Sequence, residues 1–391
     1  MFNLTTEELE VNKAVHTAKE IYQQPNVWKE LADMVFKQKD VWKEFIESIY
    51  AKHEQVRVIF TGAGTSAFTG DTLVPELRKQ TGGKVTFESI ATTDIVSNPE
   101  AYLFKEVPTI MVSFARSGNS PESVAAVSLG EQLIDDFYQV VITCNKEGQL
   151  ATNIKQDKNA ITILMPDEAH DQGFAMTSSF TCMMMAAYAV FTEKPFTGNG
   201  AKLLIANAER FLESITDKVD SMLDFDFSRI VYLGSGLLGQ LSHEAALKML
   251  ELSAGKVVAV HESSLGFRHG PKSILHDKSA VVLFISSDAY TRKYDMDILR
   301  ELAADDSGLK VIALTEKQDE EVDELADWAI AANTSEESFS GDFQLSFIYI
   351  LFAQLLSLKK SLQLGITPDN PSPDGRVNRV VQGVRIYEYT E

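Results

Sequence analysis

The sequence of 391 residues has little cysteine, no excess of positive charge and no long uninterrupted apolar run. Its two cysteines, Cys144 and Cys182, are too few for a disulfide framework, and both lie in apolar stretches where a thiol acts as a small hydrophobic group. The formal net charge of −20 disfavours binding to nucleic acid or to anionic membranes. An anionic small molecule would therefore have to be bound by local donors, such as loop amides, hydroxyl groups and a few cations.

Other absences exclude further classes of protein. No apolar run reaches the ~18 residues of a membrane-spanning helix, and the segment Met1 to Glu10 lacks the basic start and apolar core of a secretion signal. We therefore expect a cytoplasmic protein. His261, His269 and His276 lack zinc-like spacing, and the sequence has no HExxH helix, so we expect no metal site. We also expect no other cofactor.

The chain opens with apolar residues at helical spacing over residues 1–50, and from about residue 56 short β-branched runs alternate with helical patterns. This alternation predicts parallel sheets covered by helices on both faces. Corresponding runs lie about 171 residues apart, which indicates two copies of a five-strand unit joined through helical sequence around residues 195–225. The expected strands are Val56–Phe60, Val85–Ile90, Thr109–Val112, Val140–Thr143 and Ile161–Leu164, followed by Ile230–Leu233, Val257–His261, Val281–Ile285, Val311–Leu314 and Trp328–Ala331.

Two loops of the first copy are rich in small and hydroxyl residues, and each follows an expected strand. The first reads Gly-Ala-Gly-Thr-Ser over residues 62–66, and the second runs from Ser113 to Ser123. Backbone amides and helix N-termini at such turns can bind an anion closely. Either loop alone could equally be a tight strand-to-helix turn, but the two together favour a phosphate site.

The second copy keeps the turn but not the same hydroxyl groups. The Gly-x-Gly pattern recurs at Gly234 and Gly236, whereas Leu237 and Leu238 replace the threonine and serine of the first copy. In the other loop an aspartate, Asp288, stands in place of a serine. We therefore predict one phosphate site per chain, in the first copy.

The second copy offers candidate catalytic groups instead. Glu244, Lys248 and Glu251 stand at positions i, i+4 and i+7, which places them on one face of a helix. From spacing alone they could also form an exposed stripe of salt bridges. His269 lies in a Gly- and Ser-containing loop, where a single histidine is often only a surface residue.

These motifs resemble two SIS (sugar isomerase) domains in tandem. Their order and spacing are similar to those of the isomerase half of glucosamine-6-phosphate synthase. The tail is similar to that of the bacterial family of galactosamine-6-phosphate deaminases and tagatose-6-phosphate ketose/aldose isomerases. The motifs are Gly62–Ser66, Ser117–Ser120, Gly234–Gly236, Glu244–Glu251, Phe267–Pro271, Pro368–Gly375 and Asn378–Val384.

The resemblance implies an α/β fold in which each SIS domain is a five-stranded parallel sheet flanked by helices, doubly wound and flavodoxin-like. It implies a helical segment at 1–50, a phosphate-binding SIS domain at 51–200, a second SIS domain with the catalytic Glu and His at 201–365, and a tail at 366–391 that closes the active site. It also implies a homodimer or higher oligomer with shared sites.

Residue roles follow from the same resemblance. Glu251 would move a proton between C1 and C2 of the sugar, His269 would open the ring, and Lys248 and Glu244 would support them. The synthase's imine-forming lysine is replaced near Arg379, and a guanidinium cannot form that imine. The residues expected to bind the sugar phosphate are Gly64, Thr65, Ser66, Arg116, Ser117, Ser120, Thr177, Ser178 and Arg379.

The function expected from this resemblance is conversion of galactosamine 6-phosphate to tagatose 6-phosphate and ammonia by proton transfer through an enamine or enediol. Ketose/aldose isomerisation of hexose 6-phosphates without deamination is the alternative. A non-catalytic sugar-phosphate sensor is a third possibility, but the sequence has no basic DNA-binding helix-turn-helix segment and both catalytic positions are filled. The residues fix neither the C4 configuration of the sugar nor the direction of the reaction.

Overall fold

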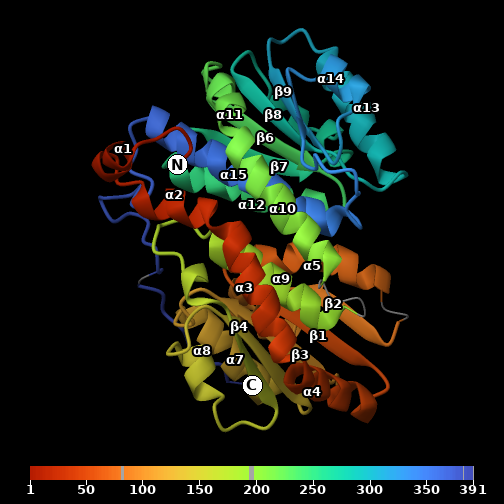
Figure 1. Ribbon diagram of the computed structural model, residues 1–391. Coiled ribbons are helices and arrows are strands. Elements are labelled where there is room, and N and C mark those ends of the chain that lie inside the picture. The colour runs from red at the N-terminus through yellow and green to blue at the C-terminus, as the bar shows by residue number, and fades with distance from the viewer. Residues whose placement is uncertain (81–82, 193–197, 382, 391) are drawn as a thin grey trace. The chain divides into compact units, whose positions relative to one another are not determined.

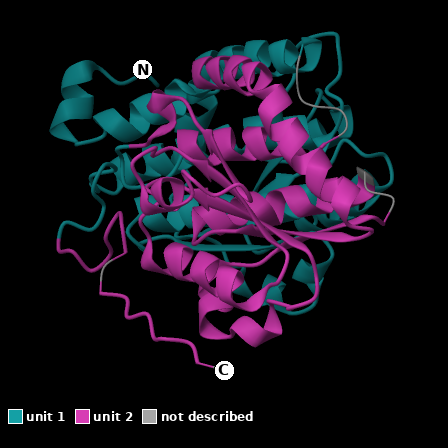
Figure 2. Ribbon diagram, turned by 90° about the horizontal axis from the view of Figure 1, so that it is seen from below, with its two compact units in different colours: residues 1–25, 172–177, 198–373 teal, residues 26–171, 178–197, 374–391 magenta. Residues whose placement is uncertain are grey.

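A computed structural model describes the chain from residue 1 to 390 except residues 81–82, 193–197 and 382 (Figure 1). The chain divides into two compact units, each built from several stretches of sequence (Figure 2). Unit 1 comprises residues 1–25, 172–177 and 198–373, and unit 2 comprises residues 26–171, 178–197 and 374–391. The linear domain boundaries expected at residues 50, 200 and 365 stay a prediction.

Unit 2 contains a five-stranded parallel sheet in the order β2-β1-β3-β4-β5. Every residue of β1, β3 and β4 is buried, as expected for strands covered on both faces. The strands are β1 (Val56–Thr61), β2 (Val85–Ser89), β3 (Thr109–Ala115), β4 (Phe137–Thr143) and β5 (Ala160–Leu164). The helices are most of α3 (Gln24–Lys37), then α4 (Lys39–Lys52), α5 (Thr65–Gln80), α6 (Thr92–Ser97), α7 (Pro121–Leu133), α8 (Gln149–Asn153) and α9 (Ser178–Phe191).

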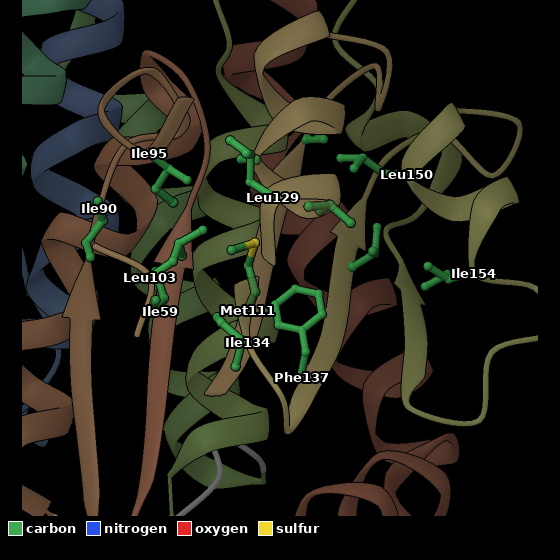
Figure 3. Close-up of a cluster of buried hydrophobic side chains, with 14 residues drawn as sticks. Ile59, Ile90, Ile95, Leu103, Met111, Leu129, Ile134, Phe137, Leu150 and Ile154 are labelled. Atoms are coloured by element: carbon green, nitrogen blue, oxygen red, sulfur yellow. The ribbon is translucent and has the colours of Figure 1, made fainter. Parts of the chain in front are cut away.

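One apolar core of unit 2 lies between this sheet and the helices on one of its faces (Figure 3). Ile59 and Met111 project from neighbouring strands and are fully buried. Ile95 of α6 and Leu129 of α7 pack on the same cluster, as does Leu150 of α8. This packing holds the carboxyl ends of the strands, and the loops that follow them, at fixed positions.

Unit 1 contains a second five-stranded parallel sheet in the order β10-β9-β8-β6-β7. Its strands are β6 (Arg229–Gly234), β7 (Val258–Ser263), β8 (Ser279–Phe284), β9 (Lys310–Thr315) and β10 (Trp328–Ala331). Its helices are α1 (Thr6–Val11), α2 (Val15–Tyr22), α10 (Asn199–Ser214), α11 (Thr216–Leu223), α12 (Leu237–Leu252), α13 (Thr291–Ala303), α14 (Glu320–Leu325) and α15 (Asp342–Gln363).

The two sheets share one topology. Read from β7, the second order is β7-β6-β8-β9-β10, which repeats the order β2-β1-β3-β4-β5 of the first. This is the flavodoxin-like, doubly wound order, so the predicted fold class is confirmed. The helical connection expected around residues 195–225 forms α10 and α11, while residues 195–197 lie outside the described part of the chain.

Helix α15 is long and apolar enough to cross a membrane by length and composition alone, although the sequence contains no uninterrupted apolar run of ~18 residues. It has a mean hydropathy of 1.3 over its most apolar 18-residue window, and 89% of that window is buried inside the fold. Polar residues such as Gln344 and Gln354 interrupt its apolar run. Burial of this extent is typical of a core helix.

Candidate active site

The first sheet has its topological switch point between β1 and β3. The chain leaves β1 toward β2 on one side and leaves β3 toward β4 on the other. Ligands of open α/β sheets bind outside the carboxyl ends of strands at such a point. Thr61 lies opposite Ser113 in the strand register, so the loops after the two strands are neighbours. We call residues 62–66 the first anion loop and residues 116–120 the second anion loop.

The first anion loop needs both of its glycines. A Cβ atom on Gly62 would lie 2.6 Å from the Cβ of Ser66, and Gly64 adopts a φ of +57° in the left-handed region. This turn starts α5 at Thr65 and Ser66, which are 4% and 6% exposed. Their amides belong to the first turn of the helix, whose positive dipole end favours an anion, and the Ser66 amide donates a hydrogen bond of 3.2 Å to the carbonyl oxygen of Ala63.

The second anion loop is positioned by its neighbour after β4. Gly118 has a φ of +69°, and Asn145 Nδ2 donates a hydrogen bond of 2.7 Å to the carbonyl oxygen of Ser117. A Cβ atom on Gly148 would lie 2.6 Å from the same carbonyl oxygen, so only glycine permits this close approach. Ser120 is the N-cap residue of α7, and in the described structure its side chain makes no capping hydrogen bond.

The C-terminal tail brings two arginines together beside these loops. The Arg116 guanidinium is buried and donates a hydrogen bond of 2.9 Å to the carbonyl oxygen of Arg379. Arg379 in turn donates to the carbonyl oxygen of Asp171. Burial, and then the charges of Arg379 and Arg116, lower the pKa of His170. The structure therefore places Arg379 next to Arg116.

Asp171 is a residue that the sequence interpretation missed. It is fully buried, and its carboxylate accepts hydrogen bonds of 3.0 Å from the backbone amides of Ser178 and Ser179 at the start of α9. A carboxylate at this position satisfies orphan amides of the helix N-terminus. The signal for it was an aspartate shortly before Ser-Ser at the head of an apolar helix. Thr177 and Ser178 are both fully buried, Thr177 in a segment of unit 1 and Ser178 in unit 2.

In unit 1, helix α12 carries the three predicted charged residues on one face. Lys248 Nζ lies 3.1 Å from Glu244 Oε1 and 2.7 Å from Glu251 Oε2. The side chains of Glu244 and Lys248 are 0% exposed, and that of Glu251 is 23% exposed. We call these three residues the α12 charge cluster. It is not the exposed stripe that spacing alone also allowed, because two of its members are fully buried.

The charges of this cluster stabilise one another. Burial alone would lower the pKa of Lys248, but the neighbouring carboxylates of Glu244 and Glu251 raise it above its ordinary value. Lys248 therefore stays protonated and fixes the carboxylate of Glu251, the partly accessible member. A carboxylate held in this way is suited to accepting and returning a proton.

His269 lies in an exposed loop after β7. It follows the short helical turn η3 (Gly266–Arg268) and precedes Gly270, which has a φ of +120°. Its backbone amide donates to the carbonyl oxygen of Gly266 at 2.9 Å. The structure thus places His269 and the α12 charge cluster in unit 1 and the two anion loops in unit 2. The functional roles of these residues stay predictions.

Among the described residues, no group of three or more His, Cys, Asp or Glu side chains is arranged to hold a metal ion. The two cysteines are free thiols, and both are buried.

The two repeats define a class of protein with two flavodoxin-like parallel sheets, of which the first has hydroxyl-rich loops at its switch point. The family model of the SIS domain matches residues 52–193 and 225–359. The chain belongs to the SIS domain family.

Individual relatives match almost the whole chain. The D-galactosamine-6-phosphate deaminase AgaS of Shewanella sp. (strain ANA-3) is 42% identical over 391 residues, which cover 99% of this chain and 96% of the relative. The crystal structure of tagatose-6-phosphate ketose/aldose isomerase from Escherichia coli matches with a TM-score of 0.87 and 39% identity, over 96% of this chain and 97% of that chain. A crystal structure from Clostridium novyi NT matches with a TM-score of 0.96 and 41% identity, over 100% and 99%.

Proposed function

We propose that this protein is an enzyme that converts galactosamine 6-phosphate to tagatose 6-phosphate and ammonia. The observation that carries the proposal is its 42% identity, over 99% of its length, to a D-galactosamine-6-phosphate deaminase. Two features, one within each unit, support the proposal. The loops at the switch point of the first sheet have the composition of a phosphate site, and α12 presents a carboxylate held by a buried lysine.

The phosphate group is assigned to the two anion loops. The amides at the start of α5 and the hydroxyl groups of Ser66, Ser117 and Ser120 would donate to its oxygens, and Arg116 would add a positive charge nearby. With a net charge of −20, the protein as a whole repels anions, so these local donors must supply the attraction. Binding energy from the phosphate would anchor the sugar while its other end reacts.

Proton transfer is assigned to Glu251. After His269 assists ring opening, Glu251 removes the proton from C2 of the aldehyde form and returns it to C1, so that the enamine becomes an imine at C2. Water then adds to C2 and ammonia leaves, which gives the ketose with one water consumed. Lys248 would hold Glu251 in place, and Glu244 would keep Lys248 charged.

A second candidate is ketose/aldose isomerisation of a neutral hexose 6-phosphate, which the 39% identity to an isomerase structure from Escherichia coli favours. It uses the same proton transfer between C1 and C2 but releases no ammonia. Incubating the purified protein with galactosamine 6-phosphate and measuring ammonia separates the two. We expect stoichiometric ammonia and tagatose 6-phosphate. Absence of ammonia, together with interconversion of tagatose 6-phosphate and its aldose, would establish the second candidate instead.

The phosphate assignment predicts the effect of Ser117→Ala. Loss of one hydroxyl donor to an anion should raise KM about 10- to 100-fold with a smaller change in kcat. Steady-state kinetics with galactosamine 6-phosphate measure both constants. The matched control is Ser128→Ala, an exposed serine on α7 in the same unit, which should leave KM unchanged. Equal KM values for the two variants would remove Ser117 from the site.

A further inference from the structure

The second repeat has its own cluster of hydroxyl groups at the matching switch point, between β6 and β8. Gly234 lies opposite Phe284 in the strand register, and the loops that follow β6 and β8 are therefore neighbours. The sequence interpretation took this copy to have lost its hydroxyl donors. The structure instead shows four serine side chains there, from the loops after three strands: Ser235, Ser264, Ser286 and Ser287.

Asp295 of α13 receives donors from all three loops. Its Oδ1 accepts hydrogen bonds of 2.6 Å from Ser235 Oγ and 2.6 Å from Ser264 Oγ, and its Oδ2 accepts one of 3.0 Å from the backbone amide of Ser286. The residue is 0% exposed. A buried carboxylate with two hydroxyl donors and one amide donor is coordinated as a bound anion would be.

Asp342, the first residue of α15, completes the pattern. Its Oδ2 accepts a hydrogen bond of 2.6 Å from Ser286 Oγ, and its Oδ1 accepts bonds of 2.8 Å from both the amide and the Oγ of Ser287. The donors of the loop after β8 are therefore directed at side chains of the protein itself.

The glycine turns of the two repeats have matching local geometry. A Cβ atom on Gly62 or on Gly234 would approach the residue four positions later at 2.6 or 2.7 Å, and Gly64 and Gly236 share φ values of +57° and +58°. Both turns therefore start their helices in the same way.

The strand registers align the second loops too. In the first repeat Thr61 pairs with Ser113, so the next residues, Gly62 and Phe114, lie opposite each other. In the second repeat Gly234 pairs with Phe284. Because Gly234 corresponds to Gly62, Phe284 corresponds to Phe114. Two residues after these phenylalanines, Ser286 therefore corresponds to Arg116. Three residues after them, Ser287 corresponds to Ser117.

The two carboxylates of the second repeat have no counterpart at the corresponding helix positions of the first. Asp295 is the fifth residue of α13, and the fifth residue of the corresponding helix α7 is Ala125. Asp342 is the first residue of α15, and the first residue of α9 is Ser178. The first repeat therefore has a small residue at each position where the second has an aspartate.

We propose that Asp295 and Asp342 are built-in anions, whose carboxylates occupy in the second repeat the position that the phosphate group of a ligand takes in the first. The comparison with the first repeat rests on the proposed function. Two consequences follow: the second repeat binds no sugar phosphate, and removing a carboxylate opens a site for a small inorganic anion such as phosphate.

The test is the thermal unfolding of Asp295→Ala with increasing inorganic phosphate, against sodium chloride at equal ionic strength. We expect the variant to have a lower Tm than the wild type, and phosphate to raise that Tm by about 2–4 °C more than it raises the wild-type Tm. The matched control is Asp297→Ala on the same helix, which removes a largely exposed carboxylate and should respond to phosphate as the wild type does. An equal phosphate response in Asp295→Ala and the wild type would overturn the proposal.

A second variant keeps the test decisive if Asp295→Ala does not fold. Asp342→Ala removes the less buried of the two carboxylates and should show the same added phosphate response. The phosphate responses of the wild type and the variants also distinguish a failure of the proposed function from a failure of this inference. If the wild type shows no phosphate response but either aspartate variant does, the first-repeat site is wrong and the built-in anions stand. If the wild type responds and neither variant responds more strongly, the built-in anions are wrong and the proposed function is unaffected.

Discussion

Glu251→Gln is expected to lower kcat for ammonia release about 10²- to 10⁴-fold, the usual contribution of a positioned general base. The amide has nearly the shape of the carboxylate and can keep one hydrogen bond to Lys248, but it cannot accept a proton. Because Glu251 does not belong to the anion loops, KM should change by no more than a few-fold. Steady-state kinetics with galactosamine 6-phosphate measure both constants.

The control for this variant is Glu47→Gln, which alters an exposed carboxylate on α4 that pairs only at 3.5 Å with Lys43. Its kcat should match that of the wild type. A Glu251→Gln enzyme that binds substrate normally and releases ammonia at the wild-type rate would show that another group transfers the proton. A parallel loss in both variants would point to a general defect in folding.

Lys248→Met should lower the free energy of unfolding by about 3–5 kcal/mol, because it removes the cation of a buried cluster and leaves Glu244 ionised and without a counter-charge. Glu244 is fully buried and lies 3.1 Å from the lysine ammonium, so water cannot replace the lost partner without opening the fold. Urea denaturation followed by circular dichroism measures the change.

An exposed ion pair on α4 provides the control for the expected loss of stability. Lys43 and Glu47 have the same i, i+4 spacing on α4, but their side chains are 50% and 64% exposed. Lys43→Met should therefore cost less than about 0.5 kcal/mol. The double variant Glu244→Gln with Lys248→Met should recover part of the loss, since it removes the unpaired charge. Equal losses for Lys248→Met and Lys43→Met would contradict a stabilising role for the buried cluster.

Most of the fold could be predicted from the sequence because its signals are local. All ten expected strands are present, and their ends shift by no more than three residues, as for β4, which begins at Phe137 rather than Val140. The recurrence of the strand pattern about 171 residues later predicted two copies of one five-strand unit, and the two sheets share one topology. The anion loops were predictable for the same reason, because the residues that form a glycine turn between a strand and a helix are consecutive in the sequence.

What the sequence did not reveal depends on burial and on contacts between distant residues. Spacing placed Glu244 and Lys248 on one face of a helix, but it could not distinguish a buried cluster from an exposed stripe. Asp295 lies 60 residues beyond Ser235, its hydrogen-bond partner, and nothing local marks the pair. Comparison of the aligned repeats suggested that the second copy had lost its donors, because the comparison followed the replacement of Thr65 and Ser66 by Leu237 and Leu238 and could not show where Ser235, Ser286 and Ser287 donate.

The tail contact also bears on how the protein is made. Arg116 lies just beyond β3, yet the carbonyl group that it contacts belongs to Arg379, 263 positions later. During synthesis on the ribosome, the second anion loop therefore cannot make this contact until residue 379 has emerged.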